Sequence, residues 1–293
     1  MTRAARSFLY VPAVKPALFD KASAGGADAS GSDADAGADA GADAVIIDLE
    51  DAVPLAQKDS ARRDVAAWLD SRTRNDTEIW VRVTPEFLAD DLDAAARAGV
   101  DGIMLAKCSV ESLAHADSLL SEFEADLGLA SIELIGLIET AHALRSLPAM
   151  ATSPRLRTFG IGEVDLLADL RITRNTDTAA VIDALRMDVV VGCAAAGLAA
   201  PIAPTSTDFR DLDGFVTTTR RFVDMGFRGR TALHPSQVPI INAALTPSDD
   251  DVARAARLLA LYDLAAGGPT VDDNGRFVDE AVVRGAREIL ARS

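Results

Sequence analysis

Acidic side chains follow short apolar runs at several places in this sequence. Glu139 comes directly after IGLI, and Asp165 lies just beyond FGIG. A carboxylate at the end of such a run is costly to bury without a cation or hydrogen-bond donors. Because carboxylate oxygens and retained waters are the ligands that Mg²⁺ prefers, Glu139 and Asp165 are candidate Mg²⁺ ligands. The alternatives are a buried ion pair for Glu139 and a helix N-cap for Asp165.

A second acidic group consists of Asp48, Glu50 and Asp51, which end another apolar run. Alternation along a strand would turn Asp48 and Glu50 the same way. These carboxylates could hold metal-bound water or orient an arginine. Alternatively, one or two of them cap the helix that follows.

Cationic side chains also occur in or after such runs. Arg82 lies inside IWVRV, where a guanidinium needs a partner, and a bidentate clamp on a substrate carboxylate is one option. Lys107 ends another run and is a second candidate substrate contact. Both cations could instead neutralise the acidic group. His234, before Pro235, would either orient a ligand or be a satisfied histidine at the rim.

The sequence does not support several other classes of protein function. The sequence has no Walker-type loop, no GxSxG elbow and no dinucleotide-binding GxGxxG motif. A formal net charge of −16 argues against nucleic acid and anionic membrane surfaces as partners. Cys108 and Cys193 are too few for a disulfide framework, which fits a reducing cytoplasm.

The elements that must position these residues alternate regularly. Short Val/Ile/Leu runs are separated by amphipathic segments such as 59–69, 110–127 and 179–196, a pattern typical of α/β proteins with a parallel sheet. Eight repeats predict a closed (β/α)8 TIM barrel, in which reactive groups gather where the strands end. An open doubly wound sheet is the competing architecture. The runs lie near 7–12, 44–49, 78–83, 102–107, 132–138, 156–161, 198–204 and 230–233.

The chain is expected to contain a barrel over residues 1–245 and a C-terminal helical extension over 246–293. Helical patterns at 249–264 and 279–290 flank the turn region GGPTVDDNGRF, and this extension would be a lid or an oligomer contact. Residues 25–43 are of low complexity and predict a flexible, functionless loop before the second strand. The N-terminal apolar run is interrupted by Pro12, Lys15 and Pro16, which favours a first strand over a signal peptide or spanning helix.

Several motifs, taken in order, resemble those of the HpcH/HpaI aldolase and citrate lyase beta-subunit family. The resemblance covers almost the whole chain apart from the segment at 25–43. The motifs are RSFLYVPAVKP, GADAVIIDLEDAV, WVRVT, LIETAHAL, FGIGEVDLLADL, TSTDFRDLDGF and GRTALHPSQV.

This resemblance implies a (β/α)8 barrel, commonly trimeric or built of trimers, that binds Mg²⁺ and acts on acyl-thioesters. Glu139 and Asp165 would be the metal ligands, and Arg82 would clamp the metal-bound oxo acid. Glu50 and Asp51 would hold waters around the metal. The tail segment GRFVDEAVV is similar to one that places an aspartate over a neighbouring subunit's site, which nominates Asp279 as a catalytic residue. Asp279 also fits an N-cap.

The sequence departs from the family pattern at three places. Pro12 to Pro16 read PAVKP instead of Pro-Gly-x-Arg-Pro, Thr84 replaces an Asn, and Ala106 precedes Lys107 where a Pro is usual. Lys15 and Lys107, which lie at two of these places, are candidate substrate contacts. These changes put the identity of the substrate in doubt more than metal binding.

The leading functional hypothesis is reversible cleavage of a 3-hydroxyacyl-thioester into a 2-oxo acid and an acyl- or acetyl-thioester, with Mg²⁺ as cofactor. One rival is a thioester hydrolase or a malate-synthase-like enzyme. Another is a barrel subunit that is inactive alone and works only on an acyl-carrier partner in a citrate lyase complex. Whichever applies, the chain is expected to form a homo-oligomer.

Overall fold

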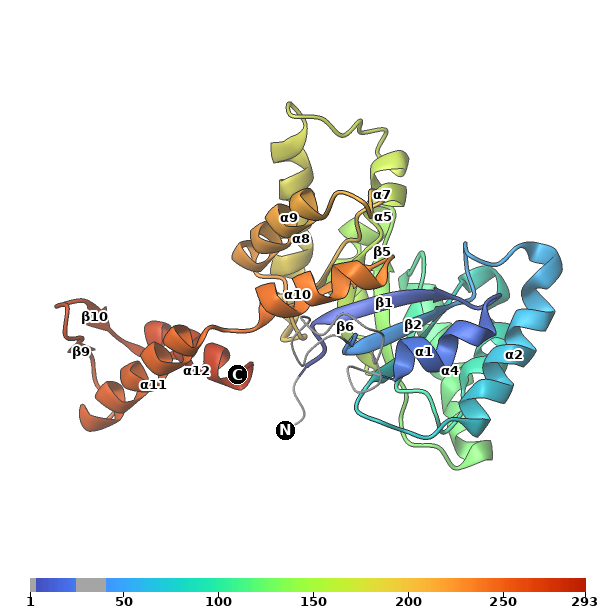
Figure 1. Cartoon of the computed structure of the whole chain (residues 1–293), viewed down its shortest axis with the longest axis horizontal. Helices are drawn as coiled ribbons and strands as arrows, with labels where there is room; N and C mark the ends of the chain where they lie inside the picture. The colour runs from blue at the N-terminus through green and yellow to red at the C-terminus, as the bar shows by residue number, and fades with distance from the viewer. Residues whose placement is uncertain (1–3, 25–40) are drawn as a thin grey trace, which may run out of the picture. The chain divides into compact units, whose positions relative to one another are not determined.

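Eight parallel strands close into a barrel in the computed structural model, which describes residues 4–24 and 41–293 (Figure 1). β1 pairs with both β2 and β8, so the sheet has no free edge. The prediction of a closed (β/α)8 barrel is confirmed, and the open doubly wound sheet is excluded. The strands are β1 (Ser7–Pro12), β2 (Ala44–Asp48), β3 (Glu78–Val83), β4 (Gly102–Leu105), β5 (Glu133–Ile138), β6 (Leu156–Ile161), β7 (Ile202–Ala203) and β8 (Gly229–Ala232).

One strand is shorter than its apolar run predicted. β7 contains only Ile202 and Ala203, whereas the run extends over 198–204. Pro201 and Pro204 flank these two residues, and neither has the N–H that a continuous ladder requires. The chain before β7 is bound to β6 by a backbone bond from the Ala199 N–H to the Arg157 carbonyl at 3.1 Å, and by the Thr158 hydroxyl, which donates to the Ala199 carbonyl at 2.8 Å.

Helices surround the barrel, and the three amphipathic segments became α2 (Lys58–Ser71), α4 (Val110–Leu127) and α8 (Ala179–Ala196) (Figure 1). Local signals fix α4 sharply: the Ser109 hydroxyl accepts from the Ser112 N–H, and Gly128 ends the helix with a positive φ of 65°. The other helices of this layer are α1 (Phe19–Ser23), α3 (Leu88–Ala95), α5 (Ala141–Arg145), α6 (Leu147–Met150), α7 (Glu163–Asp169), α9 (Leu212–Met225) and α10 (Val238–Leu245).

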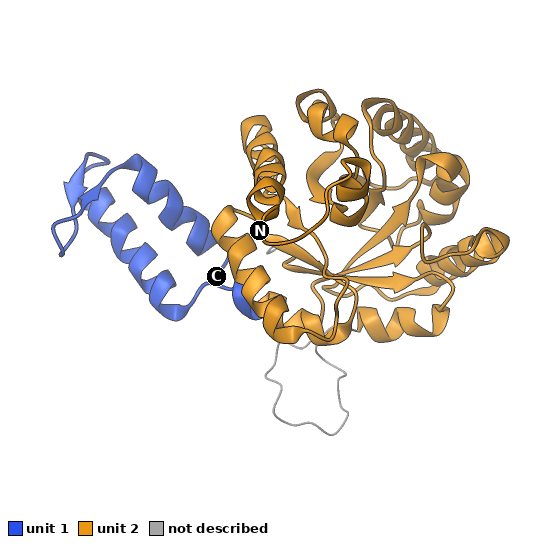
Figure 2. Cartoon of the chain, turned by 90° about the horizontal axis from the view of Figure 1, so that it is seen from above, with its two compact units in different colours: residues 1–4, 243–293 blue, residues 5–242 orange. Residues whose placement is uncertain are grey.

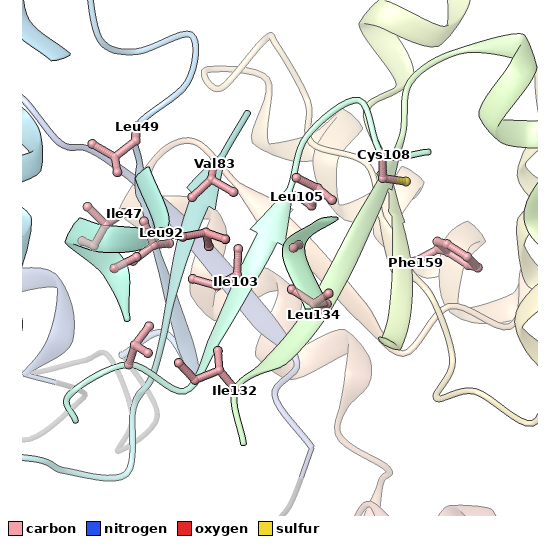
Figure 3. Packing of buried hydrophobic residues seen from close by; sticks show 14 of the residues in the cluster. Ile47, Leu49, Val83, Leu92, Ile103, Leu105, Cys108, Ile132, Leu134 and Phe159 are labelled. Carbon is pink, nitrogen blue, oxygen red and sulfur yellow. The ribbon is translucent and has the colours of Figure 1, made fainter. Parts of the chain in front are cut away.

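The strands are apolar on both faces because each face is buried. Ile47, Val83 and Ile103 point outward and pack with helix residues such as Leu92 (Figure 3). A smaller cluster that includes Ile46, Trp80, Met104 and Ile135 fills the barrel interior. These two sets alternate along β2, β3 and β4, so the parity of a residue there decides whether it faces the helices or the interior.

The chain divides into two compact units, residues 5–242 and residues 243–293 with the N-terminal four (Figure 2). The C-terminal unit contains α11 (Asp249–Leu264) and α12 (Glu280–Ala291). Between them the predicted turn region forms a small antiparallel hairpin of β9 (Thr270–Val271) and β10 (Phe277–Val278), which the sequence did not lead us to expect. Most of the low-complexity segment 25–43 falls outside the described residues. No helix in 4–24 or 41–293 is long and apolar enough to cross a membrane.

Candidate active site

The alternation of side chains along the strands places the candidate residues on the interior side of the barrel wall. Asp48 follows Ile46 by two positions on β2, and Arg82 follows Trp80 by two on β3, so both continue the interior rows. Glu139 stands two positions beyond Leu137, another interior residue, at the end of β5. The same alternation therefore brings an arginine and two carboxylates to the carboxyl-terminal mouth of the barrel.

Arg82 is held in place by two carboxylates and an aromatic ring. Its Nε and Nη2 donate to Asp48 Oδ1 and Oδ2 at 2.8 and 2.6 Å. Its Nη1 lies 2.9 Å from Glu50 Oε2, so Asp48 and Glu50 turn the same way, as alternation predicted. The guanidinium lies 4.8 Å from the centre of the Tyr10 ring. The arginine is oriented rather than free.

The charge of the Glu50 carboxylate depends on the two cations beside it. Its carboxylate is buried between Arg82 and Lys107, whose Nζ lies 3.0 Å from Oε1. Neither oxygen has a hydrogen bond of good geometry from the described residues. Burial raises the pKa of Glu50, although Arg82 and Lys107 act to lower it. Lys107 therefore contacts the acidic group, which was one of its two predicted roles.

Glu139 is almost completely buried, at 2% exposure, and forms no ion pair with the described residues. The alternative interpretation of Glu139, a buried ion pair, is therefore contradicted. Its Oε2 accepts a hydrogen bond from the backbone N–H of Lys107, a residue with a left-handed φ of 46°. A Cβ at Gly162 would come within 2.3 Å of Glu139 Oε1, so only glycine leaves room for this carboxylate.

Glu139 has a strongly perturbed protonation equilibrium. Burial, with the charge of Glu50, raises its pKa to about 8. The Lys107 N–H and Arg82 oppose this shift, and Asp165 adds to it. A buried carboxyl that has two other carboxylates nearby and no ion pair favours either a proton or a bound cation.

A cleft of about 420 Å³ opens beside these residues and is lined by Tyr10, Arg82, Glu139 and Asp165, among others. Asp165 lies exposed in the first turn of α7, whose N-cap is Gly162. The alternative interpretation of Asp165 as the helix N-cap is therefore contradicted, and its carboxylate remains available to the cleft.

Glu139 and Asp165 fit a Mg²⁺ ion. No three His, Cys, Asp or Glu side chains within the described ranges gather closely enough to form a complete metal cage. Mg²⁺ rarely needs one, because it keeps several waters and is usually bound through one or two carboxylates plus substrate oxygens. The glycine cradle at Gly162 and the raised pKa of Glu139 match such a site.

Other predicted site residues do not line the cleft. Lys15 and Asp51 are exposed and are not among the residues that line the cleft. The His234 ring bonds to Ser236 at 2.8 Å and stacks on Phe209, which agrees with a satisfied rim histidine. Asp279 belongs to the C-terminal unit, where its Oδ1 caps α12 by accepting from Ala281 and Val282.

Three contributors to the site were not predicted from the sequence: Tyr10, Gly162 and the backbone of Lys107. Tyr10 had a usable signal, because it precedes a strand end by two positions and so shares the interior parity of Phe8. The positive φ of Lys107 could not be predicted, because nothing in the sequence distinguishes this lysine from others.

A closed parallel barrel with carboxylates and an oriented arginine at its carboxyl-terminal mouth is the architecture of a barrel enzyme. The chain belongs to the family described as HpcH/HpaI aldolase/citrate lyase, whose model matches residues 32–235. It is accordingly an enzyme of the carbon–carbon lyase type.

Similar proteins cover the same length. The citrate lyase subunit beta of Leuconostoc mesenteroides is 29% identical, with 98% of this chain and 93% of that protein aligned. A (3S)-malyl-CoA thioesterase of Cereibacter sphaeroides is 30% identical over 98% of this chain and 94% of its own. The crystal structure of the CitE protein of Mycobacterium tuberculosis with magnesium, acetoacetate and coenzyme A is 28% identical, with a TM-score of 0.74 and coverage of 100% and 99%.

Proposed function

We propose that this enzyme cleaves, or forms, a 3-hydroxyacyl-thioester of the malyl, citramalyl or citryl class, giving a 2-oxo acid and an acetyl- or acyl-thioester. Mg²⁺ would be held by Glu139 and Asp165. The observation that carries this proposal is Glu139 itself, a buried carboxylate without an ion pair to any described residue, which lines a cleft together with Asp165 and Arg82.

The reaction breaks the bond between the carbinol carbon and the thioester α-carbon. The hydroxyl loses a proton, and the α-carbon gains one. When bound, Mg²⁺ supplies charge stabilisation at the oxygen that becomes the ketone. Arg82, fixed by Asp48, Glu50 and Tyr10, donates its remaining N–H groups to the carboxylate of the oxo acid.

Asp279 is proposed to hold or deliver the proton at the α-carbon, from the C-terminal extension of a neighbouring subunit. Its Oδ1 serves the N-terminus of α12, whereas Oδ2 has no hydrogen bond within the described part of the chain. This role requires a homo-oligomer, and we propose a trimer or a trimer-based assembly. Residues 246–293 would then act as the extension that completes a partner's site.

Lys107 and Lys15 are proposed to contact the carrier end of the thioester, and Asp51 to hold water near the metal. Half of the Lys107 side chain is exposed although its Nζ contacts Glu50, so it can also reach an anionic ligand. The reduced cysteines Cys108 and Cys193 agree with a cytoplasmic location, which we propose for the protein.

The test uses purified full-length protein with Mg²⁺ and a panel of malyl-, citramalyl- and citryl-CoA. Release of oxo acid together with the shorter thioester is expected. Glu139→Gln should abolish turnover and weaken Mg²⁺ binding beyond the roughly 10–100-fold that loss of a supporting group costs. Glu133→Gln, on the exposed start of the same strand, is the matched control and should behave as the unchanged protein. Turnover of no thioester in the panel contradicts the proposal.

The thioesterase similarity keeps hydrolysis as a second candidate. Free thiol without oxo acid would select a hydrolase, and free thiol with condensation of an oxo acid would select a malate-synthase-like reaction. The citrate lyase similarity keeps the carrier-dependent subunit as a third. Turnover of acyl-carrier thioesters but not of CoA esters would select that alternative.

A further inference from the structure

The cleft has a second wall that the proposed reaction does not use. β7 is so short that the segment after it, Pro204 to Asp208, leaves the sheet early and lines the cleft. Beyond this segment the cleft reaches the layer of α7, α8 and α9. This second wall of the cleft carries the side chains of three arginines, Arg174, Arg186 and Arg230, and the ring of Phe222.

These arginines outnumber the acidic partners that are buried with them. Glu163, 6% exposed, pairs with Arg174 and with Arg186, whose Nη2 donates to Oε1 at 2.7 Å. Arg186 also contacts Asp183 at 2.9 Å, but Arg221 shares that carboxylate from the outer side. Among these three arginines and their two carboxylate partners, positive charge is therefore in excess, although Asp165 and Asp208 also line the cleft.

Arg230 carries this surplus. It is 2% exposed and forms no ion pair with any described residue. Its Nε donates to the Pro204 carbonyl at 3.2 Å, and its Nη1 donates to the Phe215 carbonyl at 3.0 Å and to the Thr219 hydroxyl. The guanidinium lies 3.7 Å from the centre of the Phe215 ring. Rings and carbonyls fix the group without neutralising it.

The charge of the buried Arg230 guanidinium is not balanced by a carboxylate of any described residue. Burial and the charge of Arg186 lower the pKa of Arg230 to about 9. An anion in the cleft would reverse this destabilisation, because charge-assisted hydrogen bonds from arginine to phosphate or carboxylate are strong and directional. The site is also rigid before any ligand arrives, which reduces the entropy that binding must lose.

We propose that Arg174, Arg186 and Arg230 form a second anion subsite in this cleft, which takes a phosphate or carboxylate group. The anion is either a free small ion or a second carboxylate of the substrate. In the latter case the wall selects thioesters that carry an extra acidic group. Binding of the free ion does not depend on the proposed lyase reaction.

The first experiment measures anion binding calorimetrically in EDTA, with inorganic phosphate and succinate as separate probes. Arg174 is half-exposed, so Arg174→Gln should fold normally and weaken binding of the preferred anion about tenfold, or about 1.4 kcal/mol. Arg230→Met should weaken it at least as much. The control is Arg221→Gln, which removes an equal charge from outside the cleft lining and should change the affinity less than about twofold.

Failure of both anions to bind the unchanged protein overturns the subsite, as does equal binding by Arg174→Gln. If Arg230→Met does not fold, the Arg174→Gln comparison still decides. A lyase-inactive protein that binds phosphate refutes the proposed reaction while leaving the subsite in place.

The source of the anion is resolved by kinetics. If the substrate supplies it, Arg174→Gln raises KM for a citryl thioester, which has two free carboxylates, more than for a malyl thioester, which has one. If a free ion supplies it, both KM values stay unchanged and binding of the preferred anion is still about tenfold weaker in the variant. Unchanged KM values together with unchanged phosphate and succinate binding contradict both forms of the proposal.

Discussion

Arg82 and Asp48 form a two-pronged ion pair across neighbouring strands, with both carboxylate oxygens within 2.8 Å of guanidinium nitrogens. The two residues stand opposite each other in the register of β2 and β3. The geometry of the sheet itself therefore sets the direction in which Arg82 presents its remaining N–H groups to the cleft.

Replacing Arg82 with methionine should destabilise the protein by about 3–5 kcal/mol, because it leaves Asp48 and Glu50 buried without their main cation. Urea denaturation at neutral pH measures this loss. Arg74→Met removes an arginine whose side chain is 56% exposed and should cost no more than about 1 kcal/mol. Equal losses in both variants would contradict a special role for the buried pair.

Gly162→Ala should weaken Mg²⁺ binding about tenfold or more, because its methyl group would displace the Glu139 carboxylate. Metal titration followed by calorimetry measures the change. Gly285→Ala is the control, since a Cβ in that part of α12 meets nothing within 4 Å. It should leave metal affinity unaltered and raise stability by up to about 1 kcal/mol. Intact Mg²⁺ affinity in Gly162→Ala would refute the cradle.

The metal-free protein should lose stability as pH rises from about 4.5 to about 8. The pKa of Glu139 is about 8 in the folded protein, against 4.5 for an unperturbed glutamate, so the folded protein holds this proton more tightly than the unfolded chain does. The contribution is fully present below pH 4.5 and is lost as pH rises through 8. Urea denaturation in EDTA should show this slope in the unchanged protein relative to Glu139→Gln. Parallel stability curves would exclude it.

Mixing two inactive variants tests the role of Asp279. Asp279→Asn and Glu139→Gln should each be nearly inactive alone. When they are unfolded and refolded together, hybrid oligomers would contain sites with Glu139 from one subunit and Asp279 from another, and activity should return. Asp279→Asn should still bind Mg²⁺ normally, and asparagine should still cap α12. Absence of recovered activity in hybrids confirmed by mass would argue against a shared site.

Much of the fold could be predicted from the sequence because its signals are local. The start and the end of α4 are fixed by Ser109 and Gly128, and the alternation in β2 and β3 predicts that Asp48 and Arg82 both face the barrel interior. The cradle at Gly162 and the wall around Arg230 could not be predicted in the same way. Each depends on strands or helices distant in sequence, and Arg230 looks in sequence like any cation near a strand.

Because β7 is short, the pairing between neighbouring strands is not equally extensive around the barrel. β6 and β7 are in register only at Gly160 and Ile202, whereas β5 and β6 stay paired along most of their length. Backbone amides around β7 should therefore exchange with solvent faster than those of β5, so local opening is concentrated at one seam. Opening at this seam would leave the long pairing of β5 with β6, and Glu139 directly after β5, undisturbed.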